Sequence, residues 1–311
     1  MKYLNDLGVQ DLLWNEWPQI IKEIEEAFLD SSVEMIPKTY LKAHPRGDFR
    51  AMPVALGDYA CLKWIGVYPS NHLISEHLPT TLGTILLNNR ETGEPLIAMD
   101  CTALTAYRTA ATSAIVAKYA AKNAKEITLI GCGDQAYYHF LAYKEVLPNM
   151  KTVCLYDKNK EAVDKLSAKI NNGKINIIKY PLTIKEAVKN ADIITTLTPS
   201  EEPYLNVHDV KSNCHINAVG ADAKGKRELM TNVIDGAADI FCDDYVQASH
   251  SGELQYNEWP YLNVIGISDL IKNHKTMQLE KGISVFDSTG VALEDIAIAI
   301  LIYRLYYQIY I

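Results

Sequence analysis

One stretch in the middle of the chain constrains the fold more than any other. Residues 127–130 form a short apolar run, and Gly131-Cys-Gly-Asp-Gln-Ala136 follows it directly. The next residues carry apolar side chains at helical spacing, and a second apolar run, residues 152–156, ends at Asp157. Strand, glycine turn, helix, strand and terminal carboxylate, in this order, predict a βαβ unit that binds a dinucleotide.

The residue types in this unit suit a nucleotide. Gly131 permits a tight turn, Gly133 lets the backbone approach a pyrophosphate, and the helix N-terminus offers free N–H groups to it. Asp157 stands where a carboxylate binds both ribose hydroxyls and repels a 2′-phosphate, so the pattern predicts NAD rather than NADP. A glycine pattern by itself also fits a tight turn in an α/β protein that binds no nucleotide.

Strand and helix patterns alternate beyond Asp157. Helical patterns at 160–170 and 184–191 stand among extended runs at 175–179, 192–197, 215–220, 240–243, 263–267 and 284–286. Strands interleaved with helices require right-handed crossovers. We therefore predict an α/β fold with a doubly wound, mostly parallel Rossmann sheet.

The N-terminal third has a different pattern. Periodicity predicts one amphipathic helix at 11–28, followed by short strands at 38–42, 49–52, 59–67, 81–88 and 96–99. An Ala-rich helix at 105–121 leads into the glycine turn. The chain ends in an apolar helix at 291–310, which we expect to pack rather than to take part in catalysis. With 311 residues, two domains are expected, the first of them β-rich.

Composition excludes several classes of protein. The formal net charge of −8 disfavours nucleic-acid binding. The six cysteines are scattered, so neither a metal cluster nor a disulfide framework is predicted. We find no apolar core of a signal peptide and no run of membrane-spanning length, and therefore expect a cytoplasmic protein.

Three cations are candidates for binding an anionic substrate. Arg108 is the sole charged residue between Asp100 and Lys118, and it can clamp a carboxylate or a phosphate or be a solvated helix charge. Lys63 lies among apolar residues in a predicted strand, as an edge guard or as a cleft residue. Arg50 lies on a neighbouring strand and can hold the same carboxylate as Lys63, or the two can be surface charges.

Asp222 is the candidate for proton transfer. It lies just past the predicted strand at 215–220, where open α/β sheets place their ligands. Lys226, four residues later, can reach a cofactor, and Asp287-Ser-Thr-Gly290 forms a similar turn at a strand end. The alternative for Asp222 is the N-cap of a helix.

Together, these motifs resemble the ornithine cyclodeaminase, archaeal alanine dehydrogenase and mu-crystallin family. The resemblance runs in order over residues 52–290. It rests on Lys63-Trp-Ile, Pro69-Ser-Asn71, Leu78-Pro-Thr80, Thr92-Gly-Glu-Pro-Leu96, Thr105-Ala-Tyr-Arg-Thr-Ala-Ala-Thr-Ser113, Gly131-Cys-Gly-Asp-Gln135, Ile216-Asn-Ala-Val-Gly-Ala-Asp222 and Gly252-Glu-Leu. It implies a homodimer with a substrate-binding and dimerisation domain over 1–118, to which 291–311 returns, and a Rossmann domain over 119–290.

The resemblance also implies roles for individual residues. Lys63, Arg108 and a third cation, either Arg50 or Lys38, hold the substrate carboxylate. Asp222, with or without Lys63, moves the proton at the reacting nitrogen, and Thr289 lies near the substrate. The implied cofactor contacts are Thr80, Arg108, Gly131, Gly133, Asp134, Gln135, Asp157, Thr198, Val219, Lys226 and Ser288.

One departure from the family bears on the substrate. Cyclodeaminases that take ornithine have a glutamate just before a Met-Pro pair, whereas this chain has Phe49-Arg-Ala-Met-Pro53. A cation there disfavours a second, distal ammonium, by about 1 kcal/mol or more. We therefore expect an NAD-dependent amino or imino acid oxidoreductase for a small 2-amino acid or a cyclic imine carboxylate. The alternatives are an ornithine cyclodeaminase that recycles NAD, and a non-catalytic ligand-binding protein of the mu-crystallin type.

Overall fold

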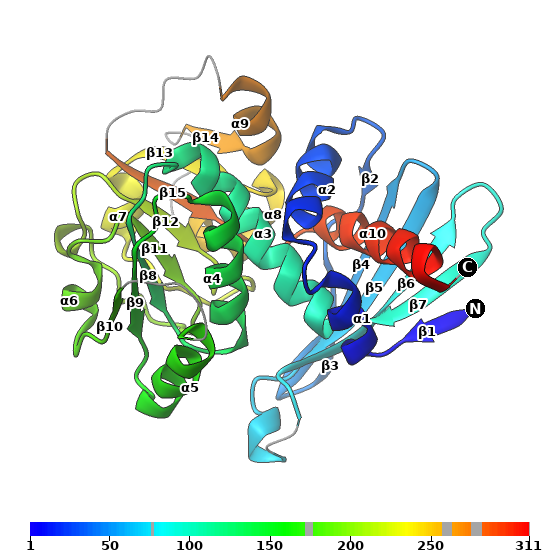
Figure 1. Cartoon of the computed structure of the whole chain (residues 1–311), viewed down its shortest axis with the longest axis horizontal. Coiled ribbons are helices and arrows are strands. Elements are labelled where there is room, and N and C mark those ends of the chain that lie inside the picture. Colours follow the sequence, from blue (N-terminus) through cyan, green and yellow to red (C-terminus); the bar gives the residue numbers. More distant parts are fainter. Residues whose placement is uncertain (76–77, 172–176, 257–262, 275–281, 311) are drawn as a thin grey trace. The chain divides into compact units, whose positions relative to one another are not determined.

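The computed structural model describes residues 1–75, 78–171, 177–256, 263–274 and 282–310, and it divides into two compact units (Figure 1). Unit 1 comprises Met1–Ala111 and Val291–Ile311, and unit 2 comprises Thr112–Gly290. The division falls inside one helix, α3 (Thr102–Ala120). The boundary predicted from the sequence, after residue 118, lies inside the same helix.

Unit 1 is built on a mainly antiparallel sheet. Its strands are β1 (Lys2–Leu4), β2 (Glu34–Met35), β3 (Thr39–His44), β4 (Gly47–Leu56), β5 (Tyr59–Val67), β6 (Thr81–Asn89) and β7 (Pro95–Asp100). The spatial order is β1-β7-β6-β5-β4-β2, with β3 also paired to β4. A short 3-10 turn, η1 (Asn71–Leu73), lies between β5 and β6. The five strands predicted from alternation are confirmed. Two strands were not predicted: β1, which pairs in parallel with β7, and β2, which pairs with β4.

Three helices accompany this sheet: α1 (Asp6–Leu13), α2 (Trp17–Leu29) and α10 (Ala292–Tyr310). The single helix predicted at 11–28 is wrong, because two helices cover that region. Asn5 caps α1 by accepting the Gly8 N–H at 2.9 Å, and Pro18 lies in the first turn of α2, where proline is tolerated. The last helix, α10, packs on α2 and on β4, β5 and β6 (Figure 1).

Alternation along β5 separates two chemical environments. Lys63 and Ile65 point to the face that α10 covers and are at most 5% exposed, whereas Leu62 and Trp64 point away and are each 39% exposed. Strand β5 lies between β4 and β6, so Lys63 is not on an edge strand. The edge-guard interpretation of Lys63 is therefore wrong.

Unit 2 contains the predicted parallel sheet. Its strands are β8 (Glu126–Ile130), β9 (Thr152–Tyr156), β10 (Ile177–Lys179), β11 (Ile193–Thr196), β12 (His215–Ala218), β13 (Ala237–Cys242), β14 (Val264–Gly266) and β15 (Ile283–Asp287). They follow the order β10-β9-β8-β11-β12-β15-β13-β14, with every described pairing parallel. The strand order reverses between β8 and β11, which is the switch point at which doubly wound sheets bind ligands. The predicted fold class is confirmed.

Helices connect these strands. They are α4 (Asp134–Val146), α5 (Lys160–Ile170), α6 (Ile184–Val188), α7 (Thr231–Asp235), α8 (Tyr245–Ser251) and α9 (Ile267–Asn273), with 3-10 turns η2 (Val207–Asp209) and η3 (Glu253–Tyr256). The core between helices and sheet is formed by apolar side chains such as Val188, Ile216 and Val285, none of them exposed. Within the described part of the chain, no helix combines the length and apolarity that crossing a bilayer requires.

Candidate functional site

The turn between β8 and α4 has the shape of a phosphate-binding loop. Gly131 has a φ of +95°, and a Cβ there would lie 2.9 Å from the Leu197 carbonyl oxygen, so glycine is required. Gly133 precedes α4, and a Cβ at that position would meet open space. Asp134 is exposed, and Gln135 is partly buried in the first turn of α4. Open space above the free N–H groups of a helix start fits a diphosphate.

Asp157 follows β9 and is bonded to this turn. Its Oδ2 accepts the Cys132 N–H at 2.7 Å, and its Oδ1 accepts the Asn159 N–H at 2.8 Å. A carboxylate has about four lone-pair positions, so each oxygen retains capacity for a ribose hydroxyl. The side chain is only partly buried, so a ligand can reach it. The residues present therefore fit an adenine dinucleotide with an unmodified ribose.

Three other predicted cofactor residues lie at strand ends in unit 2. Thr198 follows β11, Val219 follows β12 and donates its N–H to the Thr196 carbonyl at 3.1 Å, and Ser288 follows β15. These are the carboxyl ends of neighbouring parallel strands, which meet at one edge of the sheet. The structure thus brings these predicted residues to one edge.

A buried carboxylate that was not predicted holds two of these loops together. Glu228 accepts the Thr198 N–H and hydroxyl at 2.7 Å each, the Tyr204 hydroxyl at 2.8 Å and the Gly220 N–H at 2.8 Å. Its pKa is raised by burial, while the bonds from Thr198 oppose the rise. A Cβ on Gly220 would lie 2.1 Å from the Thr198 carbonyl oxygen, so the loops approach this closely only because position 220 is glycine.

Two more buried carboxylates, those of Glu253 and Asp287, also accept backbone N–H groups. Glu253 accepts the Glu228 N–H at 2.6 Å, and Asp287 accepts the N–H groups of Glu253 and Leu254 at 3.0 Å each. Burial raises the pKa of Asp287 to about 8. Burial and the neighbouring Asp287 raise the pKa of Glu253 to about 9. The sequence carries no signal for this role of the two acids, although Gly252-Glu-Leu belongs to the family resemblance and Asp287 was noted at a strand end.

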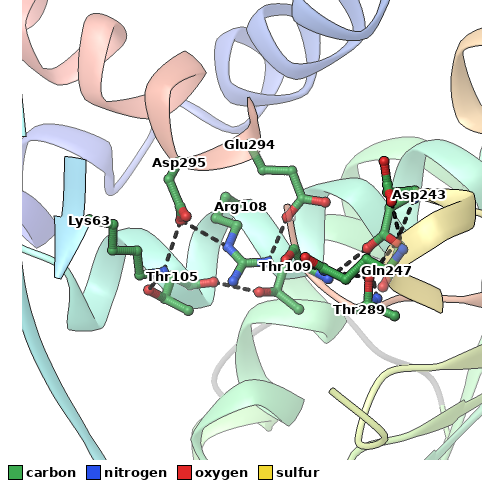
Figure 2. Close-up of polar contacts among 12 residues, drawn as sticks. Lys63, Thr105, Arg108, Thr109, Asp243, Gln247, Thr289, Glu294 and Asp295 are labelled. Carbon is green, nitrogen blue, oxygen red and sulfur yellow. Dashed lines mark hydrogen bonds and ion pairs between the residues drawn. The ribbon is translucent and has the colours of Figure 1, made fainter. Parts of the chain in front are cut away.

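Thr289 is held by a further buried acid, Asp243 (Figure 2). The N–H and the hydroxyl of Thr289 each donate to Asp243 at 2.7 Å, and the Gly290 N–H donates to the same carboxylate at 2.6 Å. The Gln247 amide donates to the Thr289 hydroxyl oxygen at 2.7 Å. Burial raises the pKa of Asp243 above its ordinary value. The turn after β15 therefore has a defined conformation within unit 2.

Asp222 forms an ion pair with Lys226, with 2.6 Å between Oδ1 and Nζ. Both side chains are partly exposed, and the turn between them contains Gly225 with a φ of +92°. No helix begins at Asp222, so the N-cap interpretation of this residue is wrong. The carboxylate is placed beyond the end of β12, where the sequence analysis expected it.

Lys63 is part of a buried ionic cluster in unit 1 (Figure 2). Its ammonium donates to the Thr105 hydroxyl at 2.8 Å and to Asp295 Oδ1 at 2.9 Å. Arg108 Nε donates to the same Asp295 oxygen at 3.2 Å, and Arg108 Nη1 donates to Glu294 at 2.5 Å. Lys63 is 1% exposed and Arg108 7%, so Arg108 is not a solvated helix charge.

The two acids of this cluster were not predicted. Glu294 and Asp295 lie in the first turn of α10 and are at most 1% exposed. Acidic residues at a helix start are common because they interact favourably with the helix dipole, so the sequence suggested no other role. The expectation that α10 only packs against its neighbours is incomplete, since this helix also binds both predicted substrate cations.

Two residues, Arg50 and Lys38, remain candidates for the third cation that holds the substrate carboxylate. Arg50 lies on the same face of the sheet as Lys63, is 4% exposed, and donates from Nε to Asp48 at 2.8 Å. It is therefore no surface charge. Lys38 immediately precedes β3 and is partly exposed. Thr80, also in unit 1, is exposed and accepts the Tyr68 N–H at 2.8 Å through its carbonyl oxygen.

The model of the ornithine cyclodeaminase/mu-crystallin family matches residues 8–307. The chain belongs to this family. It is 36% identical over 301 residues to an alanine dehydrogenase of Archaeoglobus fulgidus, with 92% of this chain and 89% of the relative covered. The predicted family is confirmed.

Solved structures agree with this assignment. An archaeal alanine dehydrogenase dimer with bound NAD superposes with a TM-score of 0.92 at 34% identity, covering 100% of this chain and 97% of the other. The Δ(1)-pyrroline-2-carboxylate reductase of Thermococcus litoralis, in complex with NADH and L-proline, gives a TM-score of 0.89 at 26% identity, covering 99% and 98%. These relatives are NAD-dependent enzymes of amino and imino acids, the class that the sequence predicted.

Among the described residues, no group of three or more His, Cys, Asp or Glu side chains is placed to bind a metal ion. All six cysteines are buried free thiols. The buried histidines are structural. His139 bonds Ser113 at 3.1 Å, and His215 bonds Ser284 at 2.9 Å and Asn217 at 3.0 Å. Burial lowers the pKa of each histidine to about 4.

Proposed function

We propose that this protein is an NAD(H)-dependent oxidoreductase acting on a small 2-amino acid or a cyclic imine carboxylate. The observation that supports it most is the glycine turn of unit 2, with open space at Gly133 and the Asp157 carboxylate bonded beside it. Unit 1 adds a buried pair of cations, Lys63 and Arg108, of the kind that binds a carboxylate. The related dehydrogenase and reductase point to the same chemistry.

In the proposed reaction, Lys63, Arg108 and either Arg50 or Lys38 orient the substrate carboxylate. Asp222 accepts the proton of the substrate ammonium, so that the nitrogen lone pair assists departure of hydride from the α-carbon. Bound NAD supplies the hydride acceptor, and NADH supplies the donor when an imine is reduced. Lys226 Nζ donates to Asp222 Oδ1 at 2.6 Å, so an ammonium lies beside the carboxylate that accepts the proton.

The proposed substrate class follows from Arg50. Its guanidinium is buried on the face of the sheet that also bears Lys63, where a distal ammonium would meet a like charge. This repulsion is absent for a substrate with a short neutral side chain, an acidic side chain, or a ring as in a pyrroline carboxylate. The bound L-proline of the related reductase is a ligand of that size.

A homodimer is part of the proposal. The face of the unit 1 sheet opposite to Lys63 bears an apolar patch formed by Leu41, Phe49, Leu62, Trp64 and Leu82, four of which are at least 39% exposed. Phe49 and Trp64 stack at 5.2 Å between ring centroids. Contiguous exposed apolar surface favours association, and the related alanine dehydrogenase is a dimer. Light scattering of the wild type and of Trp64→Glu tests this, and a monomeric wild type would contradict it.

The function is tested by an NADH absorbance screen. We expect turnover with alanine, with pyruvate plus ammonia, or with a cyclic imine carboxylate, and little or none with ornithine and lysine. If ornithine with catalytic NAD yields proline and ammonia without net NADH, the protein is instead a cyclodeaminase, the activity in the family's name. If NADH binds and no amino or imino acid reacts, it is a binding protein.

A further inference from the structure

One oxygen atom joins the two cations proposed to bind the substrate. Asp295 Oδ1 accepts from Lys63 Nζ at 2.9 Å and from Arg108 Nε at 3.2 Å (Figure 2). Lys63 belongs to β5, Arg108 to α3 and Asp295 to α10, so three elements distant in sequence meet at this atom. The bridge restricts where each cation can be relative to the other.

The environment of this bridge requires a charged partner. Lys63 and Asp295 are at most 1% exposed, and an unpaired charge at such a place is costly to bury. Two cations, Lys63 and Arg108, meet two acids, Glu294 and Asp295, so their formal charges cancel. The first turn of α10 adds the positive end of a helix dipole, which favours carboxylates there.

The contacts also leave Lys63 able to bind a substrate. An ammonium has three N–H donors, and here one goes to Thr105 and one to Asp295. These two bonds determine the direction of the third. We propose that Asp295 is a positioning residue for the substrate carboxylate: its bridging oxygen aims Lys63 and Arg108. This inference rests on the proposed function and adds a residue outside the predicted site.

The test compares Asp295→Asn with Thr105→Val. Asn keeps the shape and an acceptor but removes the counter-ion of Lys63, whereas Val removes the neutral contact and leaves the ion pair. For Asp295→Asn we expect KM for the amino or imino acid to rise about 10- to 100-fold, the loss of one charge-assisted bond, with kcat much less affected. As the pH rises, kcat/KM of this variant should begin to fall at a lower pH than that of the wild type. The reason is that an ammonium without a counter-ion loses its proton more readily.

Thr105→Val should raise KM less and leave the pH profile unchanged. NADH affinity, measured by fluorescence, should change much less than KM in all variants, because the glycine turn and Asp157 lie in unit 2 and, of the implied cofactor contacts, only Arg108 touches Asp295. An Asp295→Asn enzyme with wild-type KM and pH profile overturns the proposal, as does an equal pH shift in both variants.

Two further results keep the inference separate from the proposed function. An inactive wild type would contradict the function itself, whereas an active wild type with an unaffected variant contradicts only the role of Asp295. If Asp295→Asn does not fold, Asp295→Glu decides, because it keeps the negative charge and moves the bridging oxygen by one methylene relative to Lys63 and Arg108. A rise in KM with the wild-type pH profile supports positioning, and an unchanged KM opposes it.

Discussion

The Asp157 carboxylate offers the sharpest test of cofactor choice. Asp157→Asn retains an acceptor for the Cys132 N–H, which Asp157 binds at 2.7 Å, but removes the negative charge. Asp157→Ala removes the acceptor as well, and with it the bond from the end of β9 to the glycine turn. The pair of variants therefore separates the charge from the structural contact.

The expected loss of NAD affinity follows from the hydrogen bonds that the ribose hydroxyls would donate to Asp157. Two ribose hydroxyls donating to one carboxylate contribute about 1.5–3 kcal/mol each, and a conservative total of about 3 kcal/mol is roughly 100-fold in Kd. Asn keeps one acceptor, so Asp157→Asn should weaken NAD binding about 10-fold and Asp157→Ala about 100-fold. For NADP, both changes also remove repulsion of the 2′-phosphate, about 4 kcal/mol per unit charge at 4 Å and moderate dielectric. NADP binding should improve or stay constant.

Fluorescence titration of the wild type and the two variants with NADH and NADPH, backed by calorimetry, gives the six dissociation constants that this comparison needs. The ratio of the NADPH to the NADH dissociation constant should fall by about 100-fold or more in Asp157→Ala. Equal weakening of NADH and NADPH binding would refute the assignment of Asp157 to the ribose, because it would mean that Asp157 only stabilises the glycine turn. A stability measurement on each variant shows whether loss of the Cys132 contact has changed the fold.

Three further predictions concern other sites. Asp222→Asn should reduce turnover by about 100-fold or more while NADH affinity changes little, and unchanged turnover would remove Asp222 from the mechanism. Arg50→Glu should improve kcat/KM for ornithine or lysine relative to alanine, and indifference would show that Arg50 lies away from the substrate side chain. His215 stays neutral in the folded chain, with a pKa of about 4, whereas the unfolded chain binds a proton below about 6.5. Its contribution to stability is therefore complete above pH 6.5 and declines toward pH 4, by about 2 kcal/mol at pH 5. Urea denaturation of the wild type and His215→Asn at pH 7 and pH 5 measures this, since the raised pKa values of Glu253 and Asp287 act equally in both proteins; equal pH dependence would contradict it.

Local pattern determined much of this protein. The βαβ unit could be predicted because a strand alternates every two residues, a helix repeats near every four, and the turn at Gly131 needs a positive φ. The parallel sheet followed from repeated strand and helix signals, since parallel neighbours require crossovers. The helix break before Pro18 was also present in the sequence, but the continuous apolar stripe outweighed it in the periodicity analysis.

Only the tertiary structure decided how distant residues pair. Asp295 meets Lys63 across 232 positions of sequence, and Glu253 meets Asp287 across 34. No periodicity links such residues, because packing of α10 on the sheet and of η3 beside β15 is a property of the folded chain. Burial then changes their chemistry: an acidic residue that would be a solvated charge on an isolated helix becomes, inside the fold, the counter-ion of a cation. The sequence thus determined which elements form and which groups are available, and tertiary packing decided which of those groups meet away from water.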